Sequence, residues 1–234
     1  GEVAYIVDGV PINDPLGGSG QTGANLTLVS GSIQEIQIIK DGFDPEYGNA
    51  LSGIVTIRSQ TGNKENTKLN LRFLTDDFGN KSLNKYSRNN DNYRVILSGP
   101  DPVLTSHILP AFGINYFRDK EFTYYLYFEG DQYDDYQQYW RYDSPTTRRN
   151  FGYFNLLGIH IPDRLKNQYN LQTNFKFHPK QNIRAVFSYK RLDYKFSNFN
   201  WDYRYSSSTI PVFEQKRNTY SLEWSHQVNK DFNY

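Results

Sequence analysis

The sequence predicts a mainly β chain in which a short-stranded region of about 62 residues precedes part of a large antiparallel sheet. Three observations predict this class. Apolar residues recur at every second position over stretches of about ten residues, which is the period of a strand with one buried face. Aromatic residues make up 17% of the chain although its mean hydropathy is only −0.75. Glycine and proline clusters mark turns between the alternating runs.

Composition excludes several classes of protein. The net charge of the 234 residues is +1, with basic and acidic residues interspersed, so nothing favours binding to nucleic acid. The absence of cysteine excludes disulfides and thiol chemistry, and the absence of an apolar run of about 18 residues excludes a transmembrane helix. Many aromatic residues at low mean hydropathy fit strands that are apolar on one face. Both transmembrane β-barrels and soluble β-sandwiches are built from such strands.

The two ends of the chain suggest that it is a fragment of a longer mature protein. It has no methionine, starts at Gly1 beside a predicted strand and ends at Tyr234 without a natural stop. We therefore expect further strands outside this sequence.

The N-terminal region is expected to hold three short strands. Val3–Val10 is one strand and ends in the turn pair Asp8-Gly9. Ile33–Ile39 and Ile54–Ile57 are the other two, because apolar β-branched residues dominate both. The segment between these two must turn tightly at its glycines and proline, which are Gly42, Pro45, Gly48 and Gly53.

After Thr61-Gly62-Asn63 the strands become longer and their alternation stricter. The clearest case is Gln168–Phe177, in which aromatic and aliphatic residues occupy one face and amides occupy the other. The expected strands of this region are Lys68–Thr75, Tyr93–Leu97, Phe122–Gln132, Gln168–Phe177, Ile183–Tyr189 and Tyr220–Val228.

The connections between these strands alternate in length. Residues 76–91, 135–165 and 197–216 are long and polar, whereas 179–182 and 229–231 are short. Outer-membrane barrels have long loops outside the cell and short turns in the periplasm. Residues 99–120 break this rule, because this proline-containing connection is long where a short turn is expected.

Four pieces in the first 62 residues, taken in order, resemble the C-terminal half of the plug domain of TonB-dependent outer-membrane receptors. They are the VDGV of Val7–Val10, the strand and lysine of Ile33–Lys40, the Tyr47-Gly48 turn with the small residues after it, and the GIVTI of Gly53–Ile57. The segment DPEYGNALSGIV most resembles receptors of the Bacteroidota type, which often carry an N-terminal carboxypeptidase-regulatory-like domain.

The resemblance implies a fold and a function. Residues 1–62 would be the second half of a small α/β plug, and residues 63–234 the first six or so strands of the barrel in the outer membrane of a Gram-negative cell. The implied activity is TonB-dependent active transport of a scarce, large nutrient. The implied partners are TonB, through a segment upstream of this chain, outer-membrane lipid and lipopolysaccharide, the unidentified nutrient, and a surface lipoprotein.

Two loops hold the candidate ligand-binding residues. Residues 13–24 would rise toward the outside in the resembled family, although glycine-rich loops are usually only flexible connections. The loop 135–165 is the longest predicted external one, where aromatic residues could form a membrane girdle and arginines could bind anions or stay solvated. The candidates are Asn13, Asp14, Ser19 and Gln21 in the first loop, and Tyr136, Tyr139, Trp140, Arg141, Arg148 and Arg149 in the second.

Catalysis is not expected. The four histidines are scattered, and no serine stands in a G-x-S-x-G turn. We therefore predict no catalytic residue, no metal ligand and no cofactor. Two rival functions remain open, namely a non-transporting outer-membrane barrel used for binding or adhesion and a soluble β-sandwich binding module.

Overall fold

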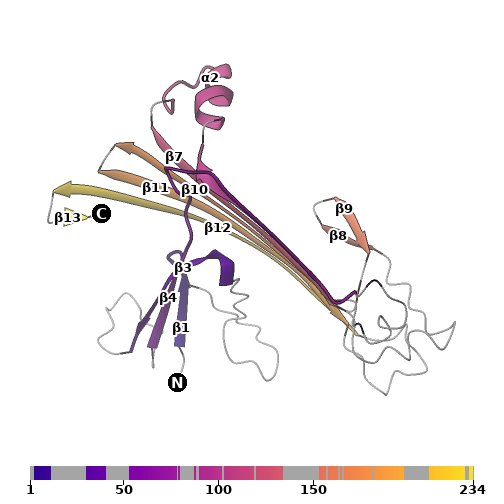
Figure 1. Cartoon of the computed structure of the whole chain (residues 1–234). Coiled ribbons are helices and arrows are strands. Elements are labelled where there is room, and N and C mark those ends of the chain that lie inside the picture. The colour runs from indigo at the N-terminus through magenta and orange to yellow at the C-terminus, as the bar shows by residue number, and fades with distance from the viewer. Residues whose placement is uncertain are drawn as a thin grey trace, which may run out of the picture.

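The computed structural model of the chain describes residues 3–11, 30–40, 53–77, 79, 87, 90–101, 103–118, 120–133, 153–156, 158–162, 164, 166–180, 182–197, 211–229 and 232–233. The expectation of a mainly β chain is confirmed. A small mixed sheet is followed by a larger antiparallel sheet, and helical structure among the described residues is short (Figure 1).

The small sheet has the strand order β2-β1-β4-β3. Strands β1 and β4 are parallel, while the β1–β2 and β3–β4 pairs are antiparallel. A short 3-10 turn, η1 (Ser30–Ser32), leads into β3. The strands are β1 (Val3–Val7), β2 (Val10–Pro11), β3 (Ile33–Ile39) and β4 (Gly53–Ser59).

The predicted turn pair Asp8-Gly9 is confirmed, but the strand expected over Val3–Val10 ends at Val7 because the chain reverses at this turn. Both residues have positive φ, 50° and 77°, which is the backbone of a two-residue hairpin turn. Val10 therefore pairs back with Val7 as the start of β2. The turn leaves the Asp8 carboxylate at the end of β1, beside Ser59.

The central strand β4 is buried on both of its faces. Ile54 and Ile57 point to opposite faces of the sheet, and each side chain is almost fully buried. Strands with two buried faces read as continuous apolar runs, which explains the Ile-Val-Thr-Ile stretch.

The large sheet is antiparallel throughout, in the order β13-β12-β11-β10-β7-β6-β5. The hairpin of β8 (Tyr153–Leu156) and β9 (Ile159–Pro162) pairs separately. The strands of the large sheet are β5 (Lys68–Thr75), β6 (Asp91–Pro100), β7 (Glu121–Tyr133), β10 (Lys166–Lys180), β11 (Ile183–Ser197), β12 (Val212–Asn229) and β13 (Phe232–Asn233).

All six strands predicted after residue 63 are present, although several are longer than expected. Strand β11 continues to Ser197 and β12 already begins at Val212, so the predicted connection 197–216 shortens to 198–211. Within the described residues the sheet is open, with β5 at one edge and β13 at the other.

The long connection between β6 and β7 contains the helical structure of this part of the chain. A π-helical turn, η3 (Leu104–Ile108), runs directly into α2 (Leu109–Ala111). Figure 1 places this connection beyond the strand ends, on the side opposite to the small sheet. Among the described residues no helix is both long enough and apolar enough to cross a membrane.

Candidate functional site

The two faces of the large sheet differ in chemistry. Because the antiparallel register aligns alternate residues, Leu71, Val95, Phe128 and Leu171 form a row across β5, β6, β7 and β10. We call the face that carries this row the apolar face. The alternation predicted for Gln168–Phe177 is confirmed by this register.

The apolar face is exposed toward both edges of the sheet, on β5 and on β12. Leu71 on β5 is 67% exposed and Leu222 on β12 is 73% exposed, and their apolar neighbours on the same strands are similarly open. On β10 the apolar positions run from Tyr169 to Phe177, roughly 27 Å along the strand at about 3.4 Å per residue. A continuous apolar surface of this extent is unusual on a protein that faces water.

Tyr93 covers a glycine on this face. A Cβ on Gly130, which stands opposite Tyr93, would overlap the tyrosine ring. The Tyr93 hydroxyl lies 3.1 Å from that of Tyr169 and donates to Gln132 at 3.3 Å. Tyr169 is buried beneath the rings of Tyr93 and Phe128.

The apolar face gives way to polar residues at the strand ends beyond Tyr169. There Arg164 pairs with Asp91, and the Asn167 side chain accepts a hydrogen bond from Gln132 at 2.6 Å. Arg191 pairs with Asp193 in the same region of β11. The apolar zone therefore ends, along the strand direction, at this end of the sheet.

The opposite face, here called the polar face, carries an ion-pair network near its middle. The Arg94 guanidinium donates to Glu129 Oε1 at 2.8 Å from Nη2 and 3.2 Å from Nε. The Tyr127 hydroxyl donates to the other carboxylate oxygen at 2.8 Å. Arg94 and Glu129 stand directly opposite each other on β6 and β7, so the register of the two strands places the pair.

The small sheet lies on this polar face, and the polar contacts that hold it there include three between described residues. The Tyr125 hydroxyl donates to the Gly31 carbonyl at 2.7 Å, and the Asn174 amide donates to the Gln60 carbonyl. Lys190 Nζ lies 2.6 Å from Asp8 Oδ2, and that carboxylate also accepts hydrogen bonds from the backbone and hydroxyl of Ser59.

Close approach of the backbone requires glycine at two points of this contact. A Cβ on Gly31 would come 2.8 Å from the Tyr127 ring, and a Cβ on Gly62 would overlap the backbone of Tyr124. Between the sheets, Thr123 Oγ1, Gln172 Nε2 and Asn174 Oδ1 are buried without a hydrogen-bond partner among the described residues. Such groups are normally satisfied by ordered water, so we expect a hydrated interface.

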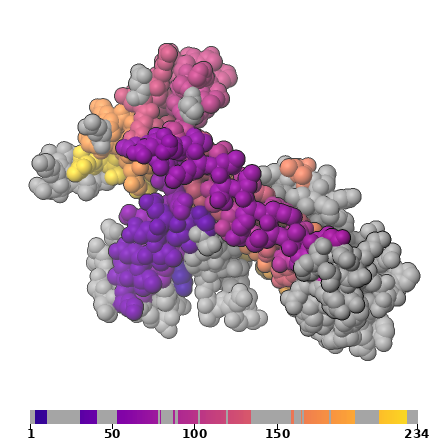
Figure 2. Space-filling view, in the orientation of Figure 1, coloured from indigo at the N-terminus to yellow at the C-terminus, as the bar shows by residue number. Residues whose placement is uncertain are grey.

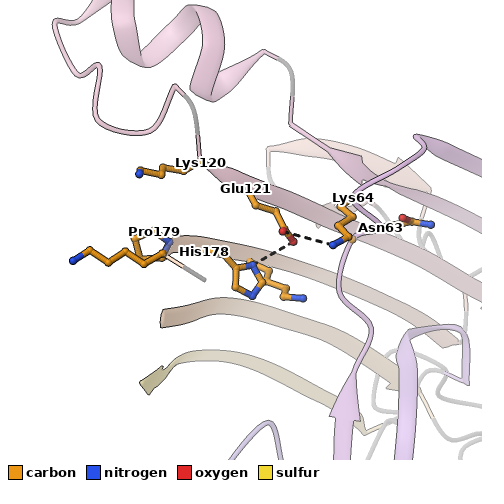
Figure 3. Close-up of a pocket in the computed structure, with 9 residues that line it drawn as sticks. Asn63, Lys64, Lys120, Glu121, His178 and Pro179 are labelled. Atoms are coloured by element: carbon orange, nitrogen blue, oxygen red, sulfur yellow. Dashed lines mark ion pairs between the residues drawn. The ribbon is translucent and has the colours of Figure 1, made fainter. Parts of the chain in front are cut away.

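A cavity of about 750 Å³ lies on the polar face where the chain passes from the small sheet to the large one (Figure 3). Glu121 points between Lys64 and His178, at 4.0 Å and 3.3 Å respectively. The other lining residues are Gly62, Asn63, Lys120, Lys176, Pro179 and Lys180. Four lysines against one carboxylate make the cavity basic, which suits an anionic group.

The cavity and the faces contain no arrangement typical of catalysis in the part of the chain that the structure describes. No group of three or more His, Asp or Glu side chains gathers there to hold a metal ion. His178 contacts Glu121, but the cavity lining has no serine, threonine or cysteine nucleophile.

The predicted ligand-binding residues lie outside the described residues. This holds for Asn13, Asp14, Ser19 and Gln21, and equally for Tyr136, Tyr139, Trp140, Arg141, Arg148 and Arg149. Their roles stay predictions. The structure instead draws attention to Asp8, Lys190 and Asn174. Sequence reasoning assigned Asp8 only to a turn and Asn174 only to a polar row, and it gave no role to Lys190, which follows the predicted strand Ile183–Tyr189.

No protein-family profile matches the chain, and no curated protein is similar to it at a significant level.

Proposed function

We propose that this chain is part of a TonB-dependent outer-membrane receptor, with the small sheet as part of the plug and the large sheet as part of the barrel wall. The observation that carries the proposal is the placement of the small sheet. It covers the polar face of the large sheet and leaves the apolar face open. A plugged barrel in lipid requires this arrangement, with polar residues inside and apolar residues outside.

The same observation disfavours a soluble β-sandwich. In a sandwich the apolar faces of two sheets meet and form the core. Here the second sheet contacts Tyr125, Asn174 and Lys190 on the polar face, while Leu71, Leu222 and Trp224 on the other face are more than half exposed. A sandwich would have to leave its largest apolar surface in water.

The open edges of the large sheet support a larger assembly. Unpaired backbone groups in lipid cost several kcal/mol each, and barrels that hold a plug use about 22 strands. We propose that further strands of the same protein continue the sheet beside β5 and beside β13. The polar row on β12, which includes Ser221 and Glu223, would then line the interior.

The proposed activity is uptake of a scarce, large nutrient, driven by TonB through a segment upstream of β1. Because β1 and β4 are parallel, a pull on the N-terminal end of β1 loads their five aligned residue pairs together. Among the described residues, three polar contacts join the small sheet to the proposed barrel wall, beside buried polar groups that we expect water to satisfy. This balance favours movement of the small sheet as a unit over peeling of its strands.

Several parts of the proposal come only from the resemblance. Location in the outer membrane, contact with lipopolysaccharide and a surface lipoprotein, and the class of nutrient all belong to it. A non-transporting barrel used for binding or adhesion would share the two sheets and differ in lacking coupling to TonB.

Fractionation of the native cells tests the proposal. The protein containing this chain is expected in the outer membrane, with a mass several times 27.4 kDa and a TonB-contacting segment before Gly1. A mature 27.4 kDa protein in the soluble fraction would contradict the barrel. An outer-membrane protein whose substrate binding and uptake do not change when TonB is deleted would support the non-transporting alternative.

A further inference from the structure

The connection between β6 and β7 is ordered by its first residue. Both carboxylate oxygens of Asp101 accept backbone hydrogen bonds, Oδ1 from Val103 and Leu104 at 3.0 and 2.8 Å, and Oδ2 from Thr105 at 3.0 Å. The Thr105 hydroxyl donates back to the Asp101 carbonyl. These bonds start the helical turns η3 and α2 in a fixed direction.

This ordered segment presents apolar side chains outward. Phe112 is 78% exposed, which is the highest value among the exposed large hydrophobic residues of the described chain. The other exposed large apolar side chains of the segment are Val103, Ile108, Ile114 and Tyr116. We call these five residues the rim patch. A hydrophobic cluster with this exposure indicates a surface that contacts something other than water.

The rim patch is continuous with the apolar face of the large sheet. Phe117 packs edge-on against Phe177, with ring centroids 4.9 Å apart, and Phe177 in turn lies beside Phe122 on the apolar face. Tyr116 stacks edge-on against Phe117 and so joins the patch to this contact. Figure 2 shows the segment as a separate projection at the strand ends, opposite the indigo small sheet.

Cationic and phenolic groups lie beside the apolar ones. Lys120 Nζ lies 5.9 Å from the centroid of the Tyr116 ring. Arg118, between these two residues in the sequence, is exposed. Tyrosine rings with nearby lysine or arginine are typical of the headgroup layer, where one end of each side chain is apolar and the other is solvated.

We propose that residues 103–117 form an interfacial segment that inserts the rim patch into the headgroup and upper acyl region of the lipid leaflet at this end of the sheet. The inference rests on the proposed function, because the apolar face must itself contact lipid. Continuity with that face selects lipid over a protein partner. It also accounts for a connection that is long where a short turn is expected.

Fluorescence quenching by brominated lipids tests the segment. The whole native protein is reconstituted in vesicles of phosphatidylethanolamine and phosphatidylglycerol, with single bimane-labelled cysteines at Phe112, Leu71 or Glu65. This chain has no cysteine of its own, and any cysteine elsewhere in the protein is replaced. Phe112→Cys reports the rim patch, Leu71→Cys the apolar face and Glu65→Cys an exposed site in the linker between the sheets.

We expect lipids brominated near the headgroup to quench Phe112→Cys at least about threefold more strongly than Glu65→Cys, and lipids brominated deep in the chain to quench Leu71→Cys most. Quenching of Leu71→Cys with none at Phe112→Cys would overturn the interfacial segment and leave the barrel intact. Absence of quenching at Leu71→Cys would overturn the proposed function. Ile114→Cys gives a second reading of the patch if Phe112→Cys does not assemble.

Discussion

Lys190 on β11 and Asp8 at the end of β1 form the ion pair that joins the small sheet to the wall of the large one, with 2.6 Å between Nζ and Oδ2. The side chains are 24% and 14% exposed, so water screens the pair only in part. Asp8 also holds Ser59 at the end of β4. The turn of the β1–β2 hairpin thus connects both parallel strands of the small sheet to the polar face.

Removal of Lys190 is therefore expected to loosen the small sheet. Lys190→Gln leaves the Asp8 carboxylate without its cation, and we expect a cost of about 1–3 kcal/mol, between the values of exposed and buried pairs. Hydrogen exchange of the β4 backbone measures this as faster exchange. The double variant Asp8→Asn/Lys190→Gln should cost less than the sum of the costs of the two single variants. Full additivity would show that the pair does not couple the sheets.

Gly62 is expected to tolerate no side chain. A Cβ there would overlap the backbone of Tyr124, which cannot move without disturbing β7. Gly62→Ala should cost about 1–3 kcal/mol or more as overpacking and reduce the yield of assembled protein. Gly53→Ala is the matched control, since its Cβ would meet Ile39 O at 3.4 Å. Equal yields from both variants would contradict the close passage of the linker over β7.

The Tyr93–Gly130 pair gives a test of packing on the apolar face. Gly130→Ala must displace the Tyr93 ring and break its hydroxyl contacts with Tyr169 and Gln132. We expect a loss of about 1–3 kcal/mol in resistance to urea. Tyr93→Phe keeps the ring over Gly130 and should lose only about 0.5–1.5 kcal/mol per hydrogen bond. A Gly130→Ala variant as stable as the parent would refute this packing.

Charge on the two faces of β12 should have unequal effects. Leu222→Arg places a cation on the proposed lipid side and is expected to cost about 2–4 kcal/mol if the site is near the bilayer midplane. Ser221→Arg is the neighbouring position on the polar face and should be nearly neutral. The fraction of folded protein in each variant is measured by gel electrophoresis, from the difference in migration between unheated and heated samples. A loss at Ser221→Arg with none at Leu222→Arg would reverse the assignment of the faces.

The strands of the large sheet were predictable because period-two alternation is a local property of the sequence. The residues at which these strands end were not predictable, and β11 shows the reason. From Ile183 to Tyr189 every apolar residue except Val186 is on the apolar face. From Leu192 onward the apolar residues lie on the polar face, and Arg191 and Asp193 lie on the apolar face. The phase of the alternation inverts where the apolar zone ends, so the sequence pattern stops before the strand does.

The docking of the small sheet could not be predicted from the sequence. Asp8 belongs to a turn pair and Lys190 follows directly after the predicted strand Ile183–Tyr189, and neither position indicates its distant partner. Tyr125 and Asn174 stand in rows of polar residues that would suit solvent equally well. Contacts between residues far apart in the sequence depend on register and twist, which local patterns do not encode.

The central claim is that the apolar face of the large sheet contacts lipid. Spin labels placed one at a time at residues 219–224 of β12, in the whole protein reconstituted in vesicles, test it most directly through collisions with oxygen and with a water-soluble nickel chelate. The account predicts a period of two, with oxygen preferred at Tyr220, Leu222 and Trp224 and nickel preferred at Thr219, Ser221 and Glu223. Preferential collision with nickel at Tyr220, Leu222 and Trp224 would contradict it.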